Sequence, residues 1–269
     1  MWKGDNIIKS NNIVIMSVFF GDLICLGGDF MNNVDLGNIR VVATDIDGTL
    51  TNREYLIDLE AITYIRLLEK NDIKVILITG HTFATVSTLS QYIGTSGPVV
   101  AENGCVIGYK WEPIMLGPPI DKKEEIIQMM ENLGFKLTKS SHFKFIDMAF
   151  RRTDKAANIT NEELHRILSS AGFEDLEISD SGFAVHIAPK GLNKGSGLVK
   201  ALEMLNVSPS EALFIGDGEN DIPAFKVVGV SVAVNNAPAT VKKHADLVTR
   251  EPYGKGFVEM AKMLLKKED

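Results

Sequence analysis

The sequence has few cysteines and no surplus of positive charge. Only two of its 269 residues are cysteines, Cys25 and Cys105, and neither belongs to a C-x-x-C pair. This argues against a zinc site or a redox pair and favours reduced thiols in a cytoplasmic protein. The formal net charge is −7, which argues against a nucleic-acid-binding surface. An anionic small molecule remains compatible with this charge, because a bound metal or a lysine can reverse the local field.

The chain also lacks an unbroken apolar stretch long enough to cross a membrane. The apolar run at residues 13–20 is interrupted by a glycine and an aspartate, and it is too short to span a bilayer. A signal peptide is one interpretation, but no A-x-A-like cleavage site follows the run. We favour another hypothesis, in which the codons of residues 27–29 form a ribosome-binding site and Met31 is the true start. We therefore interpret residues 1–38 as a leader and exclude residues 1–30 from the fold.

From residue 39 onward, short apolar segments rich in β-branched residues alternate with amphipathic segments. Strands are expected at residues 39–46 and 73–80. Between them, apolar residues recur every third position from Leu59 to Leu68, as on one face of a helix. This alternation predicts an α/β fold, a Rossmann-like parallel sheet with helices on both faces.

The alternation is interrupted in the middle of the chain. Residues 111–120 are rich in proline and glycine, and we expect them to form a linker. Residues 116–188 contain adjacent strands without helical crossovers, which predicts an inserted small α+β cap domain with antiparallel pairing. The core domain is then discontinuous and consists of residues 39–115 and 189–269.

Polar residues follow three of the predicted parallel strands and begin one of the helices. The carboxyl ends of parallel strands form the ligand-binding edge of an open sheet, so we expect these residues to meet in one cleft. Carboxylates brought together repel unless a cation compensates, and hard oxygen ligands suit Mg²⁺. A hydroxyl, glycine amides and a lysine suit a phosphate group. The residues concerned are Asp45, Asp47, Thr49, Thr79, Gly80, His81, Lys194, Asp217, Asn220 and Asp221.

The aspartates at the end of the first strand can divide the chemistry of phosphoryl transfer. Asp45 can attack phosphorus as a nucleophile and form an aspartyl phosphate. Asp47 can protonate the leaving oxygen and then activate water, and Gly48 permits a sharp exit from the strand. The alternative is that both aspartates are ordinary turn residues, and the coincidence of the other motifs argues against it.

Four motifs along the chain carry a family resemblance. In order, DIDGTLT, LITGHT, NKGSG and GDGENDIPAF resemble the motifs of the haloacid dehalogenase superfamily, and the cap between the second and third resembles the Cof type. The short cap, GPVVAENG at residues 97–104 and PYGKGF at residues 252–257 are similar to those of archaeal-type phosphoglycolate phosphatases. One departure is His81, which stands where many Cof-type relatives carry arginine.

The resemblance implies a role for each motif residue. Asp45 is implied as the nucleophile and Asp47 as the general acid and base. The substrate phosphate would be held by Thr79, Gly80 and Lys194, with support from Asn220. A Mg²⁺ cofactor would be bound by Asp45, Asp217 and Asp221 and by the backbone carbonyl of Asp47. The implied activity is hydrolysis of a small phosphate ester, with 2-phosphoglycolate as the expected substrate.

Several residues have competing interpretations. Asp221 can stabilise a helix N-terminus, bind the metal, or do both. His81 can cap the following helix or contact the substrate, and His186 is interpreted as a structural histidine in an apolar strand. Arg151 and Arg152 can bind a substrate carboxylate or form a solvated strand edge. Lys194 on its own would be a surface lysine, and only its place before GSG and a helix favours the site. In the cap, we expect a core built from Phe143, Phe145 and Phe150.

The functional alternatives are a sugar-phosphate phosphatase or a phosphosugar mutase, which can use the same nucleophile, and a phospho-accepting receiver, which needs no acid and base. A dinucleotide-binding oxidoreductase is excluded because no G-x-G-x-x-G follows the first strand. The expected partner is therefore a small phosphate ester, with no nucleic acid and no membrane. The sequence is also compatible with a homodimer.

Overall fold

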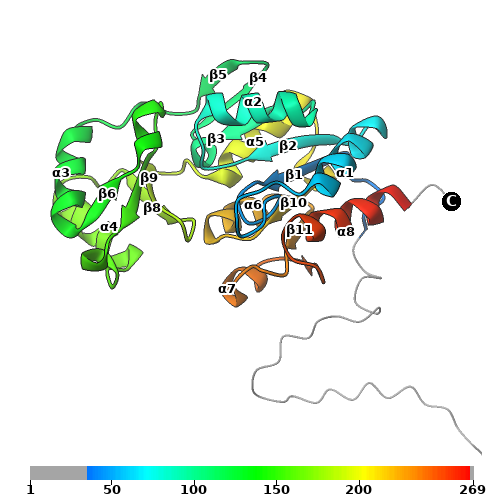
Figure 1. Ribbon diagram of the computed structural model, residues 1–269. Coiled ribbons are helices and arrows are strands. Elements are labelled where there is room, and N and C mark those ends of the chain that lie inside the picture. Colours follow the sequence, from blue (N-terminus) through cyan, green and yellow to red (C-terminus); the bar gives the residue numbers. More distant parts are fainter. Residues whose placement is uncertain (1–34, 267–269) are drawn as a thin grey trace, which may run out of the picture.

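The computed structural model describes residues 35–266 (Figure 1). The interpretations of residues 1–31, including the thiol of Cys25 and the start at Met31, lie outside this range. Within it, no helix has the length and apolar character needed to cross a membrane.

An eight-stranded sheet forms the centre of the larger part of the molecule, with the strand order β12-β11-β10-β1-β2-β3-β4-β5. Six strands are parallel, as predicted: β1 Val41–Asp45, β2 Lys74–Ile78, β3 Val99–Ala101, β10 Ala212–Gly216, β11 Val230–Ala233 and β12 Leu247–Val248. The strands β4 Val106–Tyr109 and β5 Glu112–Met115 extend one edge in antiparallel fashion. All five residues of β1 are buried, because this strand lies between β10 and β2.

Helices cover both faces of this sheet, as the sequence predicts (Figure 1). Alternate residues of β1 point to opposite faces, so Val42 packs in one core and Val41 in the other. The first core contains α1 Leu59–Lys70, α2 Phe83–Ile93 and α8 Tyr253–Leu265. The second core contains α5 Lys194–Leu205 and the short helices α6 Ile222–Phe225 and α7 Ala239–Lys242.

Helix α1 shows how the apolar pattern sets the buried face. Asp58 caps the helix by accepting hydrogen bonds from the amides of Glu60 and Ala61. The buried residues are Ala61, Ile65 and Leu68, which lie three or four positions apart on one side of the helix. The predicted stripe is wrong at Leu59, which is 78% exposed. Leu59 precedes Ala61 by two positions, about 200° around the helix axis, and therefore faces solvent.

A second, four-stranded sheet lies beside the main one, with the order β6-β7-β9-β8. All its pairings are antiparallel, which confirms the α+β cap. The strands are β6 Phe135–Leu137, β7 Met148–Arg152, β8 Leu176–Asp180 and β9 Val185–Pro189. Helices α3 Lys123–Leu133 and α4 Asn161–Ser170 share a hydrophobic core with this sheet. The boundaries at residues 116 and 188 stay a prediction.

Two expectations about the middle of the chain are wrong. The predicted linker at residues 111–120 begins with β5, which pairs with β4 through a tight turn in which Lys110 and Trp111 have positive φ angles. The predicted cap core is wrong for Phe143 and Phe145, which are 77% and 46% exposed. Strand β7 begins only at Met148, so the inward–outward alternation of a strand does not apply to them. Phe150, inside the strand, is buried as expected.

Candidate active site

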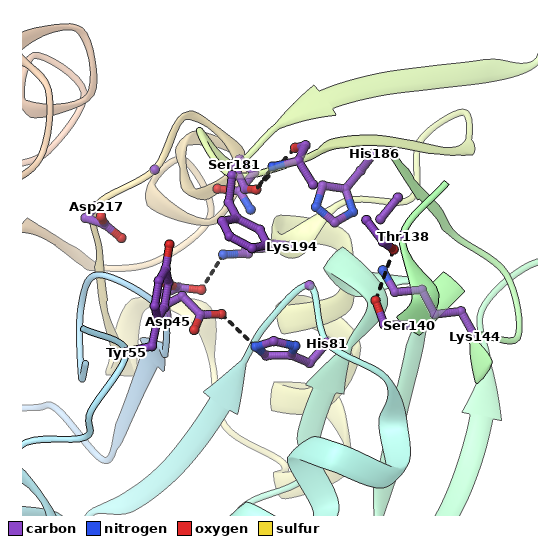
Figure 2. A pocket seen from close by; sticks show the side chains of 17 residues that line it. Asp45, Tyr55, His81, Thr138, Ser140, Lys144, Ser181, His186, Lys194 and Asp217 are labelled. Atoms are coloured by element: carbon purple, nitrogen blue, oxygen red, sulfur yellow. Dashed lines mark hydrogen bonds and ion pairs between the residues drawn. The ribbon is translucent and has the colours of Figure 1, made fainter. Parts of the chain in front are cut away.

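The predicted site residues gather at the carboxyl edge of the parallel strands. Asp45 is the last residue of β1, and the segments after β2 and β10 supply Gly80 and Asp217. Asp45, Gly80 and Asp217 line one cleft of about 400 Å³, and residues of the cap, including Lys144 and His186, form part of its wall (Figure 2). Side chains distant in the sequence thus meet here because parallel strands end at a common edge.

Lys194 lies between two buried carboxylates. Its Nζ atom is 2.6 Å from Oδ1 of Asp45 and 2.6 Å from Oδ1 of Asp221. The ammonium is fixed at the start of α5, because Asn193 and Ser196 form a capping box there. Burial alone would lower the pKa of Lys194, but the carboxylates of Asp221 and Asp45 outweigh it and raise the pKa. The surface-lysine interpretation is wrong, since Lys194 is 2% exposed.

Asp217 is held beside these groups by two loops. Its Oδ1 accepts a hydrogen bond from Thr49 Oγ1 at 3.1 Å, and its Oδ2 lies 3.4 Å from Nδ2 of Asn236. Gly48 has a φ angle of +83°, and a Cβ atom there would lie 2.3 Å from Oδ2 of Asp217. Glycine is therefore required both by the left-handed conformation and by the close approach of this carboxylate.

Asp45, Asp217 and Asp221 form a candidate metal site. Each offers a carboxylate oxygen, and these oxygens lie within 4.8 Å of one another. Lys194 is the cation in contact with two of them, so three carboxylates face one positive charge. Burial, together with the neighbouring Asp221 carboxylate, raises the pKa of Asp217 to about 7. Burial also raises the pKa of Asp45 well above its usual range, against the effect of Lys194. A hard divalent cation fits this all-oxygen set and would stabilise the charged forms.

Asp221 stabilises the loop after β10 in addition to its place in the carboxylate cluster. Its Oδ2 accepts hydrogen bonds from the amides of Asp217 and Gly218, both at 2.9 Å. The carboxylate thus shapes the turn that presents Asp217, in addition to its contact with Lys194. The candidate metal ligand of the sequence interpretation fits this geometry, whereas the side chain of Asp221 accepts no capping hydrogen bond from α6, the helix that follows it.

Asp47 lies at the mouth of the cleft with His81. Oδ2 of Asp47 is 2.8 Å from Nε2 of His81, and the two side chains are 39% and 45% exposed. The helix-cap interpretation of His81 is wrong, because Thr82 caps α2 by accepting a hydrogen bond from the amide of Thr85. His81 instead orients the proposed acid and base.

The predicted phosphate-binding residues occupy different depths. Thr79 is fully buried, and its hydroxyl oxygen accepts a hydrogen bond from the amide of His81 at 3.1 Å, which shapes the loop below the cleft. Gly80 and Asn220 line the cleft itself. Nδ2 of Asn220 donates a hydrogen bond to Oδ1 of Asn103 at 3.1 Å.

The sequence reasoning missed several residues of the cleft. Asn236 does not line this cleft but contacts Asp217 beside it, and it was detectable, because it follows β11 and therefore reaches the same edge of the sheet as the other motifs. Lys144 and Phe183 come from the cap and Tyr55 from the loop after β1, and no spacing pattern marks them. His186 is buried and structural in part, as interpreted, but it also lines the cleft.

The two cap arginines have other partners. Arg152 forms an ion pair with Asp180 and hydrogen-bonds to Asn161, so the solvated-edge interpretation does not describe it. The guanidinium of Arg151 lies 4.5 Å from the ring centroid of Phe183. Neither arginine lines the cleft of Figure 2.

Comparisons with known proteins agree with this architecture. The family model for haloacid dehalogenase-like hydrolases matches residues 42–161 and 135–260. The chain belongs to this family, and several of the curated relatives that it matches are named phosphoglycolate phosphatases. One relative, a phosphoglycolate phosphatase of Methanopyrus kandleri, is 34% identical over 85% of this chain and 98% of its own length. Another, phosphoglycolate phosphatase 1 of Saccharolobus solfataricus, is 38% identical over 86% and 97%.

Solved structures share the fold. A Thermoplasma acidophilum protein superposes with a TM-score of 0.74 at 26% identity, over 84% of this chain and 98% of its own. A haloacid dehalogenase-like hydrolase of Bacteroides thetaiotaomicron gives a TM-score of 0.66 at 21% identity, over 84% and 99%. At the latter level of identity the similarity concerns the fold alone.

Proposed function

We propose that this chain is a Mg²⁺-dependent phosphomonoester hydrolase that converts 2-phosphoglycolate into glycolate and phosphate in the cytoplasm. The observation that carries the proposal is the meeting of Asp45, Asp47, Lys194 and the Asp217–Asp221 loop in one covered cleft. The choice of 2-phosphoglycolate is supported by the names of the curated relatives and by the small volume of the cleft.

In the first step, a carboxylate oxygen of Asp45 bonds to phosphorus and the ester oxygen leaves as an alcohol, with a proton from Asp47. In the second step, water attacks the phosphorus of the aspartyl phosphate and gives a proton to Asp47, which releases phosphate and restores Asp45. The contact with His81 keeps Asp47 turned toward the leaving oxygen.

Charge balance explains the remaining residues. Lys194 and the amide of Gly80 would hold the phosphate oxygens, and Thr79 would support the loop that presents this amide. Asn220 lies beside them in the cleft. Asp45, Asp217 and Asp221 would hold Mg²⁺, together with the backbone carbonyl of Asp47. When bound, the ion would offset negative charge on the transferring phosphoryl group.

A screen of phosphorylated metabolites with Mg²⁺, ranked by kcat/KM for phosphate release, tests the proposal. We expect 2-phosphoglycolate to rank first. A sugar phosphate in first place would favour the sugar-phosphate phosphatase, and an isomerised sugar phosphate without free phosphate would favour the mutase. A phosphorylated protein that persists for minutes without turnover would favour the receiver.

A further inference from the structure

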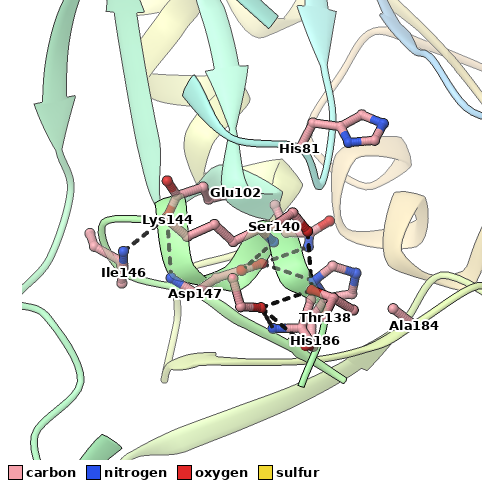
Figure 3. Close-up of polar contacts among 12 residues, drawn as sticks. His81, Glu102, Thr138, Ser140, Lys144, Ile146, Asp147, Ala184 and His186 are labelled. Carbon is pink, nitrogen blue, oxygen red and sulfur yellow. Dashed lines mark hydrogen bonds and ion pairs between the residues drawn. The ribbon is translucent and has the colours of Figure 1, made fainter. Parts of the chain in front are cut away.

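The wall of the cleft nearest the cap contains a buried ionic cluster that phosphoryl transfer does not use. Nζ of Lys144 lies 2.5 Å from Oδ1 of Asp147, and Nδ1 of His186 lies 2.9 Å from Oδ2 of the same carboxylate. The three side chains are 1%, 0% and 7% exposed. Figure 3 shows these side chains gathered around Asp147. Burying ionic groups costs free energy even when they are paired, because they lose their hydration. The presence of such a cluster beside a cleft therefore points to a functional role.

The cluster has unused hydrogen-bonding capacity. An ammonium group can donate three hydrogen bonds, and among residues 35–266 Lys144 donates one, to Asp147. Nε2 of His186 has no partner within the same range, since only Nδ1 is engaged. Both oxygens of Asp147 are occupied, because Oδ2 also accepts from Nδ2 of Asn103 at 3.0 Å. The free capacity therefore belongs to the two basic side chains, and both line the cleft.

This capacity lies close to the phosphate-binding loop. A Cβ atom on Gly80 would lie 3.1 Å from Cε1 of His186, so the imidazole packs directly against the loop. A phosphate held at Gly80 and Lys194 would thus place atoms one or two bonds beyond its ester oxygen beside His186. Tyr55 and Phe183 meet edge to face, with ring centroids 5.7 Å apart, at the same cleft. Both rings line the cleft.

We propose that Lys144 and His186 form the subsite for a carboxylate of the substrate, so that this enzyme selects phosphate esters of short hydroxy acids. The inference rests on the proposed phosphatase function. The free N–H groups of Lys144 supply charge-assisted donors for a planar carboxylate, and a ligand carboxylate beside Nε2 would favour the imidazolium form of His186, which then donates from this atom. Lys144 and His186 share a single protein carboxylate, that of Asp147. The carboxylate of the substrate would supply a second negative charge to this pair of basic side chains.

The core holds this subsite in place through two consecutive residues. The carboxylate of Glu102 accepts hydrogen bonds from the amides of Phe145, Ile146 and Asp147, at 3.0, 2.9 and 3.3 Å. Asn103 joins Asp147 to Asn220 through its two amide atoms. The proposed carboxylate subsite and the phosphate site are therefore fixed relative to each other, and Glu102 and Asn103 are positioning residues.

The test compares two esters of equal chain length, 2-phosphoglycolate and ethyl phosphate, which lacks the carboxylate. For the wild-type enzyme we expect kcat/KM to favour 2-phosphoglycolate, mainly through KM. The double variant Lys144→Met with Asp147→Asn removes both partners of the ion pair, so no unpaired charge remains buried. We expect the ratio of the two kcat/KM values to fall on the order of 10- to 100-fold, the usual effect of losing a charge-assisted hydrogen bond. Lys139→Met, an exposed lysine of the same cap segment, is the control and should keep the wild-type ratio.

The outcomes separate the subsite from the phosphatase function. A wild-type enzyme that cleaves both esters equally well overturns the subsite and leaves the phosphatase function standing, and this result needs no variant. A double variant with the wild-type ratio also overturns the subsite. Failure to release phosphate from either ester, or from p-nitrophenyl phosphate with Mg²⁺, overturns the proposed function and the subsite with it.

Discussion

Nε2 of His81 lies 2.8 Å from Oδ2 of Asp47 at the mouth of the cleft. The ring therefore fixes one oxygen of Asp47 and leaves the other available to a leaving group. In this chain the side chain binds the proposed acid and base.

Asp47→Asn tests the acid and base. The amide can keep a hydrogen bond to His81 but cannot exchange protons, so we expect kcat to fall by roughly 10²- to 10⁴-fold. Steady-state phosphate release measures the change. His81→Gln is the companion variant and should cost less, because it loosens the orientation of Asp47 and keeps its proton. Full activity of Asp47→Asn would remove Asp47 from this role.

Asp45→Asn tests the nucleophile. The substitution is nearly isosteric and removes the carboxylate that attacks phosphorus, so turnover should be abolished while the fold is kept. Phosphate release and far-UV circular dichroism measure the two effects. In the wild-type protein, mass spectrometry of the trapped intermediate should place the phosphoryl group on Asp45. An adduct on another side chain would contradict the assignment.

Removal of the metal should stop turnover without unfolding the protein. Asp45 and Asp221 already contact Lys194 in the structure, so part of the carboxylate charge is compensated by the chain itself. Excess EDTA should abolish phosphate release, and Mg²⁺ should restore it. Thermal unfolding, followed in parallel, should stay a single cooperative transition. Activity that survives exhaustive chelation would rule out the metal requirement.

Gly48→Ala should weaken the metal site. The added methyl group would lie 2.3 Å from Oδ2 of Asp217 and would displace this carboxylate, so more Mg²⁺ should be needed for half-maximal activity. Gly172→Ala is a matched control, because Gly172 also has a left-handed φ angle, +89°, but open space around its Cβ position. Both variants should lose about 1 kcal/mol of stability from backbone strain. An equal Mg²⁺ requirement in the two variants would refute the role of Gly48.

His186 should make stability dependent on pH. Burial lowers the pKa of His186, against the opposing effect of Asp147, while the unfolded-state value is about 6.5. As pH falls through 6.5, the unfolded chain takes up the proton before the folded one, so stability decreases. His186→Gln removes this component. Urea unfolding at pH 7.5 and 5.5 should show wild type losing roughly 1 kcal/mol more than the variant. His165→Gln, on the exposed side of α4, should behave like wild type.

The sequence predicts those features that depend on local pattern. Buried β-branched runs mark β1 and β2, and the polar residues that follow them meet because parallel strands end at one edge. The cap wall of the cleft is different. Lys144, Asp147 and His186 come together through antiparallel pairing of β7 with β9, which brings Ala149 opposite His186, and no motif or periodicity specifies that register.

Errors at Phe143 and Phe145 have a related cause. Their alternation with polar residues is typical of a strand, but Glu102, from the core, binds the amides of residues 145–147 and takes the place of a neighbouring strand. A tertiary contact from a distant segment thus decides the local backbone, and the sequence of the cap alone does not contain that information.

The route of the chain from the cap to Lys194 has a consequence for divergence within the family. The connection between β9 and α5 consists of residues 190–193. At its end, the carbonyl oxygen of Asn193 packs closely against Gly104. We expect this contact and the capping box of Asn193 and Ser196 to hold the Lys194 ammonium group in place when residues of the cap upstream change. Substrate selectivity and bond cleavage therefore depend on different parts of the chain. Natural variants can acquire new substrates through substitutions in the cap while the residues that cleave the phosphate ester stay unchanged.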